Sequence, residues 1–201
     1  MKKLFIFVAA FSLISFSVRD PEISKKEKKF ASKFLKQTRD AVGDAVKGLS
    51  DAQLKFKPAE DSWGVEECVK HIAITEQMLW GMLEENLKNP PTPEKRSEVK
   101  MSDEEVINLV ESRAKKVKTF DPAKPENTPY KNLDEALSSF RQNREKLIDF
   151  IKSTDADLRN HVIPLPFGSV DGYQFVLFIS GHTDRHTQQI NEVKANPGFP
   201  K

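Results

Sequence analysis

The chain is poor in the residues that build small cross-linked folds. Of its 201 residues, one is Cys and eight are Gly. Cys68 has no second cysteine to pair with, so an intramolecular disulfide is excluded. Its apolar neighbours in a helical pattern favour a buried core residue over a reactive thiol. Stability must therefore come from helix packing or from a bound metal.

Charge of one sign is also scarce. The chain has 32 Lys and Arg against 30 Asp and Glu, a formal charge of +2. The short basic run at residues 25–29 opens a helical pattern and is most simply a solvated face. Without a long basic stripe, nucleic-acid binding is not expected. The sequence also has no Gly-rich phosphate loop, no serine nucleophile elbow and no Cys–His constellation, so those catalytic classes are not indicated either.

The first residues have the three parts of an export signal. Met1, Lys2 and Lys3 form a basic start, residues 4–16 are almost entirely apolar, and small serines precede the charged residues that follow. This pattern predicts a signal peptide over 1–17, a mature domain over 18–201, and a periplasmic or extracellular location. The apolar run is shorter than the ~20 residues that span a bilayer, so a retained anchor is the weaker alternative. Loss of two lysines would bring the formal charge from +2 to 0.

Apolar residues recur at three- and four-residue steps in most of the remaining chain, which is the signature of amphipathic α-helices. Long helices are predicted over 24–47, 64–87, 133–153 and 173–193, with a further helix starting at Ser102. In the first, the predicted buried face is centred on Phe30, Phe34, Ala41, Ala45 and Leu49, with Leu35 and Val42 beside it. In the helix after Ser102, the predicted stripe is Val106, Val110, Ala114 and Val117.

Caps and breakers set the ends of these segments. Gly48 follows the first helix, where a left-handed residue commonly closes a helix. Ser62 can cap the next helix, with Glu66 close to the capping-box position, and Ser102 with Glu105 is typical of a capping box. Proline clusters separate the helices, and residues 167–172 predict a short turn or hairpin. The fold class is therefore all-α, a four-helix bundle with short extra turns in its connectors. The long connectors allow a crossover, which periodicity does not decide.

Three of the four histidines form a candidate metal site. His182 and His186 stand four residues apart, so both imidazoles project from one face of a helix and can reach one ion. They share that face with the apolar Phe175 and Ile190. His71 belongs to another helix and could face the same interior. Three histidines leave a coordination position open, which is typical of a reactive rather than a structural site. The alternative is buried histidines satisfied by side chains or water.

The other polar residues near these faces carry weaker signals. His161 lies in an irregular stretch and is interpreted as a loop residue. Gln189 lies near the buried stripe and is a candidate to hydrogen-bond a metal-binding histidine and hold its ring in place. Thr75 and Glu76 are interpreted as solvated helix surface, as is Glu67. Asn143 and Arg144 interrupt an apolar face, which fits either a polar cavity or a bundle edge.

Three segments resemble the DinB-like (YfiT-like) metal-binding four-helix bundles. They are the connector 49–58, the segment 62–73 that leads from Ser62-Trp63-Gly64 to His71, and the closing helix His182-Thr-Asp-Arg-His186-Thr-Gln-Gln-Ile190. Gly64 stands where the family usually has Ser after Trp. The resemblance spans roughly residues 24–195. It implies an up-down-down-up bundle with one long crossover, zinc or nickel on His71, His182 and His186, and frequent homodimers.

The resemblance also bears on activity. The family includes transferases and isomerases that use low-molecular-weight thiols, which are chiefly cytosolic, so export argues against that role. The sequence then predicts an exported divalent-metal-binding bundle acting as a metal-dependent hydrolase or transferase on an unidentified small molecule. A non-catalytic bundle that binds metal or a small molecule is the alternative, and a metal-free structural bundle is the third. Membrane contact is expected only through the export signal. No catalytic base is indicated.

Overall fold

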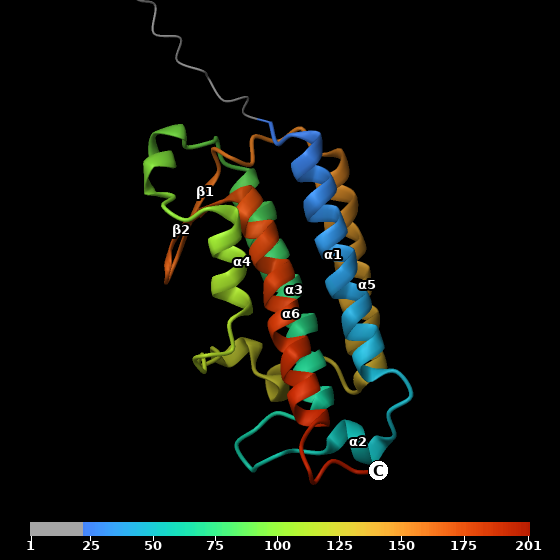
Figure 1. The fold of residues 1–201 in the computed structure, drawn as a ribbon. Helices are drawn as coiled ribbons and strands as arrows, with labels where there is room; N and C mark the ends of the chain where they lie inside the picture. Colours follow the sequence, from blue (N-terminus) through green and yellow to red (C-terminus); the bar gives the residue numbers. More distant parts are fainter. Residues whose placement is uncertain (1–21) are drawn as a thin grey trace, which may run out of the picture.

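The computed structural model describes residues 22–201, so the predicted signal peptide over 1–17 lies outside the described residues. Helices dominate this part of the chain (Figure 1). In order, the elements are α1 (Lys25–Val46), α2 (Asp51–Lys55), α3 (Val65–Leu87), η1 (Pro93–Glu98), α4 (Asp103–Glu111), η2 (Asp121–Ala123), η3 (Pro125–Asn127), α5 (Leu133–Ser153), β1 (Val162–Leu165), β2 (Gly168–Asp171) and α6 (Gly172–Lys194).

Four long helices form the bundle. Helix α1 packs against α5 and α6, and α3 packs against the same two helices. In Figure 1, α1 and α6 run down the bundle, whereas α3 and α5 run up. Because α3 and α5 are parallel, the chain must return from one end of the bundle to the other between them, through residues 88–132. This is the predicted up-down-down-up order with one long crossover, which carries α4 along α6.

The buried face of α1 differs from the predicted one by a rotation about the helix axis. The fully buried apolar residues are Ala31, Leu35 and Val42. Phe30, placed on the buried face by its spacing, is 50% exposed, so this prediction was wrong. One residue corresponds to about 100° of helix. Helix α1 carries two neighbouring apolar stripes. Its contacts with α5 and α6 bury the stripe that contains Leu35 and leave Phe30 largely exposed.

Helix ends follow local hydrogen bonding. The Ser102–Glu105 capping box is present, and Gly48 has φ of 73° just beyond α1, as predicted. The predicted Ser62 cap is wrong. Gly64 is the N-cap residue of α3, and its N–H donates to the Glu67 carboxylate at 2.9 Å. A Cβ at Gly64 would lie 2.6 Å from the Phe56 carbonyl oxygen, which accounts for the glycine at this position.

Helix α4 is shorter than its apolar stripe predicted. It ends at Glu111, and Ala114 and Val117 lie exposed in the connector beyond it. Val106 and Val110 pack toward α6, as predicted. Close approach of the two helices depends on Gly181, where a Cβ would come under 3.0 Å from the Val110 side chain. Val106 and Val110 are the buried contacts that hold this short helix on α6. The residues after Glu111 leave the helix and continue toward the end of the bundle.

The predicted hairpin exists as an antiparallel pair, with Val162 opposite Asp171 and Leu165 opposite Gly168. It leads directly into α6, because the Asp171 side chain caps that helix. Within residues 22–201, no helix is both long and apolar enough to cross a membrane.

Candidate metal centre

The bundle brings the three predicted histidines together. His71 comes from α3, and His182 and His186 come from successive turns of α6. Each offers a ring nitrogen, and these three atoms all lie within 4.8 Å of one another. The ring centroids are 4.4 to 5.2 Å apart. Such a spacing is one that a single ion can bridge. We refer to these three residues as the His trio.

Hydrogen bonds orient two of the three imidazoles. His71 Nδ1 lies 2.7 Å from the Ala123 carbonyl oxygen, and His186 Nδ1 lies 2.9 Å from Gln189 Oε1. Both partners are acceptors, so Nδ1 carries the proton in each ring and Nε2 is left with its lone pair. No hydrogen bond reaches either Nε2 within the described residues. A metal-binding histidine typically donates its other N–H to such a carbonyl or side-chain oxygen, so the trio fits a divalent ion.

Burial keeps the trio uncharged. It lowers the pKa of His71 to about 4, although the bond to Ala123 acts the other way. Burial lowers the pKa of His182 to about 3, with smaller contributions from the charges of His71, Arg185 and Arg144. The pKa of His186 lies well below its ordinary value for the same leading reason. Near pH 7 all three imidazoles are therefore neutral, the state that binds metal.

Aromatic side chains surround part of the trio. The Trp63 ring centroid lies 4.8 Å from that of His71 and 6.0 Å from that of His186, and Phe178 lies 6.2 Å from His182. His71 and His186 are buried, whereas His182 is only partly buried. The trio is therefore walled by apolar surface but not sealed. Trp63 stood in the sequence as part of a family-like segment, and nothing in the sequence indicated that it packs on the histidines.

The crossover supplies contacts that sequence reasoning missed. Besides Ala123 on His71, Arg113 donates to Gln189 Oε1 at 3.3 Å, so the amide oxygen that holds His186 is itself held. Gln189 was predicted near the site, and it touches His186 as expected. Ala123 acts through its backbone carbonyl, which any residue carries. No side-chain pattern could have identified it.

A second polar group lies at the centre of the bundle, and here the predictions for Thr75 and Glu76 fail. Thr75 and Glu76 were expected on the surface, and Arg144 at an edge or a cavity. All three are buried, and Arg144 is 0% exposed. Arg144 is paired with Glu76 and also donates to Thr38 and Thr183. Arg144 can be buried because Glu76 compensates its charge inside the bundle. A search of the sequence for apolar stripes therefore could not predict its position.

The remaining candidates lie elsewhere. His161 precedes β1 in an irregular segment, as predicted, but it is buried and is not one of the clustered histidines. Glu67 pairs with Lys57 instead of joining the trio. Within residues 22–201, the trio is the only group of three or more metal-ligating side chains with this spacing, and it contains no carboxylate.

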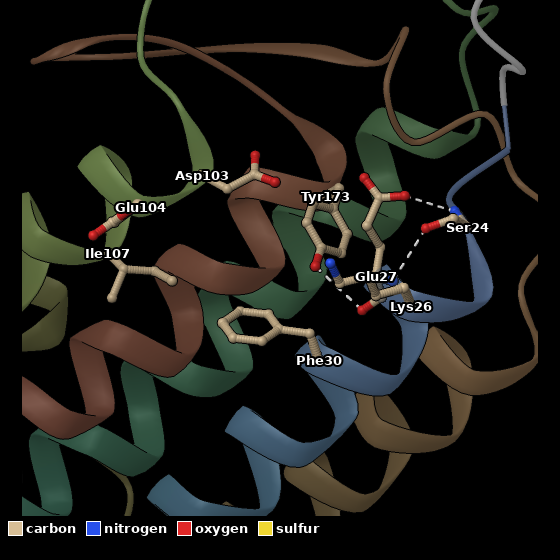
Figure 2. A pocket seen from close by; sticks show the side chains of 8 residues that line it. All are labelled: Ser24, Lys26, Glu27, Phe30, Asp103, Glu104, Ile107 and Tyr173. Atoms are coloured by element: carbon tan, nitrogen blue, oxygen red, sulfur yellow. Dashed lines mark hydrogen bonds between the residues drawn. The ribbon is translucent and has the colours of Figure 1, made fainter.

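A groove on the surface of the bundle is separate from the trio. It measures about 530 Å³ and lies between the start of α1, α4 and the start of α6 (Figure 2). Phe30, Ile107 and Tyr173 form its apolar part, and acidic side chains lie on its rim. Tyr173 is nine residues from His182, about 13 Å along the helix. The groove therefore does not open onto the histidines.

The crossover topology and the three neutral histidines between α3 and α6 define the class of protein: a helical bundle with one candidate metal centre. The sequence model of the DinB superfamily matches residues 35–190. The chain belongs to this superfamily.

Two similar proteins come from Bacillus subtilis. YuaE of strain 168, an uncharacterised protein, is 27% identical over 159 residues, which cover 79% of this chain and 93% of YuaE. The solved structure of YfiT matches with a TM-score of 0.60 at 15% identity, covering 89% of this chain and 91% of YfiT. YfiT is described as "a probable metal-dependent hydrolase with an unusual four-helix bundle topology". At this identity the likeness establishes the shared fold alone.

Proposed function

We propose that the protein binds one divalent metal ion, zinc or nickel, through Nε2 of His71, Nε2 of His186 and a ring nitrogen of His182. The observation that carries this proposal is the convergence of three neutral imidazole nitrogens within 4.8 Å. Nitrogen ligands of this kind suit zinc and nickel. Two of the rings already have the tautomer that metal binding requires, since Ala123 and Gln189 accept from their Nδ1 atoms.

We further propose a hydrolase or transferase activity on a small molecule. A metal ion held by three histidines supplies a bound water of lowered pKa and polarises a carbonyl or phosphoryl oxygen. The protein's own contribution is to fix the imidazoles, to exclude water on the Trp63 side, and to leave the His182 side accessible. The description of YfiT as a probable metal-dependent hydrolase favours hydrolysis.

Elemental analysis of the purified full chain tests the metal proposal. We expect near-stoichiometric zinc or nickel, directly or after reconstitution, and its loss in His186→Ala. His161→Ala is the matched control, because His161 is equally buried but lies outside the trio. A metal that stays bound in His186→Ala, or a wild-type protein that refuses both ions, would contradict the proposal.

Catalysis needs its own measurement. We expect the metal-loaded protein to hydrolyse activated esters, amides or phosphoesters in a panel of small substrates, and His71→Ala to lose that turnover together with the metal. Stoichiometric metal without turnover on any substrate, combined with spectroscopic evidence of a fourth protein ligand, would favour the non-catalytic metal-binding bundle instead.

Export and self-association complete the proposal. We propose that residues 1–17 are removed on export and that the mature protein forms a homodimer. Amino-terminal sequencing of the protein recovered from outside the cytoplasm should begin near residue 18, and light scattering should give twice the chain mass. Recovery of the intact chain in the cytoplasm would argue against export.

A further inference from the structure

Arg185 is a buried arginine with no carboxylate partner. It is only 8% exposed. Within residues 22–201 its one hydrogen bond runs from Nη2 to the Lys115 carbonyl oxygen at 2.7 Å, and it takes part in no ion pair. A guanidinium has five N–H donors. Most of the Arg185 donors therefore have no hydrogen-bond partner in the described chain, and its charge is offset only by Glu192, which does not form an ion pair with it.

Two other arginines with little exposed side chain, Arg144 and Arg159, show how this chain usually compensates a guanidinium charge. Arg144 is paired with Glu76, and Arg159 is paired with Asp103, Asp171 and Glu27. Burying a guanidinium without a counter-ion is unfavourable. Against this background, Arg185 is the exception among the buried arginines of residues 22–201, and its isolation indicates a counter-ion that comes from outside.

The acidic groups near Arg185 are engaged elsewhere. Glu192 accepts two hydrogen bonds from Arg113, at 3.0 and 2.6 Å. Asp184 accepts from Gln188 at 2.7 Å. Burial, and then the negative charge of Asp184, raises the pKa of the Glu111 carboxyl. None of the three forms an ion pair with Arg185.

The connector over Arg185 adds positive charge. Residues 113–118 include Arg113, Lys115, Lys116 and Lys118 and contain no acidic residue. The three lysines are exposed. The same connector continues to Ala123, whose carbonyl accepts from His71. This irregular connector therefore runs from Arg185 to the His trio, and its cationic side chains lie along it.

Arg185 is also close to the trio along α6. It immediately precedes His186 and lies three residues after His182, and its charge contributes to the lowered pKa of His182. Residues three apart are neighbours on one side of a helix, so Arg185 lies on the same side of α6 as His182. Planar guanidinium groups bind carboxylate and phosphate oxygens in pairs, which fixes both the position and the orientation of the ligand.

We propose that Arg185, assisted by the basic connector 113–118, is a subsite for the anionic group of a small substrate, a carboxylate or a phosphate, whose other end is presented to the His trio. This inference rests on the proposed function, because it assigns the substrate class of the same site. It makes Arg185 a specificity-determining residue, and it places substrates without negative charge outside the preferred class.

Calorimetric titration with inorganic phosphate and with acetate tests the subsite, on the full chain with and without zinc. In Arg185→Gln we expect phosphate affinity to fall about tenfold or more, the loss of charge-assisted hydrogen bonds, while zinc stoichiometry stays that of the wild type. Arg185→Lys should weaken binding less, because it keeps the charge but loses the planar pair of donors. Arg141→Gln, an exposed arginine on α5, is the control and should leave affinity unchanged.

The outcomes separate the two proposals. Equal phosphate affinity in wild type and Arg185→Gln, with zinc bound in both, would overturn the subsite and leave the metal proposal standing. Failure of the wild type to bind either zinc or nickel would overturn the metal proposal, and the titration without zinc would still decide the subsite. If Arg185→Gln does not fold, as judged by circular dichroism, Arg185→Lys decides: an affinity at least threefold weaker supports the subsite, and an unchanged one contradicts it.

Discussion

The Arg144 guanidinium holds both carboxylate oxygens of Glu76, with Nη2 at 2.7 Å from Oε2, at a position where neither side chain is more than 1% exposed. Its remaining donors reach the Leu35 carbonyl and the hydroxyls of Thr38 and Thr183. These partners come from α1, α3 and α6, so with Arg144 on α5 the network joins all four long helices. The pair therefore fixes the relative rotation of the helices in the layer next to His182.

Removing one member of this pair should destabilise the bundle strongly. Glu76→Leu leaves a guanidinium charge without a counter-ion, and we expect a loss of about 3–5 kcal/mol in the free energy of unfolding, measured by urea denaturation. The double variant with Arg144→Met should recover much of that loss. Glu145→Gln, which breaks the exposed pair with Arg39, should cost no more than about 1 kcal/mol. Equal effects of the buried and exposed changes would contradict this account.

Gln189 should tune metal affinity without being a ligand. Its side-chain oxygen accepts from His186 Nδ1, so Gln189→Ala frees the ring to rotate and to change tautomer. We expect metal affinity to fall about 10- to 100-fold at unchanged stoichiometry, measured by competition with a chromogenic chelator. Gln188→Ala is the matched control, since that amide contacts Asp184 and the Glu111 carbonyl. A similar loss in both variants would point to a general effect on α6.

Two glycines inside helices should respond in opposite directions to the same change. Gly181→Ala introduces a methyl group into the contact with Val110 and should destabilise the protein by about 1–3 kcal/mol through overpacking. Gly81→Ala adds a methyl group into open space on an exposed helix position, and it should stabilise the protein by about 0.5–1 kcal/mol. Thermal melting of both variants checks the pair. Stabilisation by Gly181→Ala would show that α4 does not pack closely on α6.

The metal-free protein should lose stability in mildly acidic solution. Because burial lowers the folded pKa of His71 to about 4 and of His182 to about 3, the unfolded chain takes up protons first as the pH falls below about 6.5. The contribution is fully present above pH 6.5 and is lost between there and the folded pKa values. Each histidine adds at most about 1.4 kcal/mol per pH unit.

Urea denaturation with a chelator present, between pH 7.5 and 5, measures this loss of stability. His71→Gln should flatten the dependence on pH by one histidine's share. A free energy of unfolding that stays constant between pH 7 and 5 would mean that the imidazoles are already solvated in the folded protein.

The sequence determined the helices, the hairpin and the identity of the clustered histidines. Periodicity over many turns is a local signal that survives into the fold, which is why Leu133–Ser153 was predicted with its observed bounds. The spacing of His182 and His186 fixed their common face before any packing was known. Gln189 could be placed beside them because it lies on the same side of the same helix.

Tertiary structure alone decided how the faces meet. Which of two adjacent stripes on α1 is buried depended on contact with α5 and α6, so Phe30 was misplaced. The Arg144–Glu76 pair joins residues 68 positions apart, and the charge of each is tolerable only because the other is present. The Ala123 carbonyl on His71 and the isolation of Arg185 likewise depend on the path of the crossover. Such relationships are made by distance in space, and a pattern along one chain does not encode them.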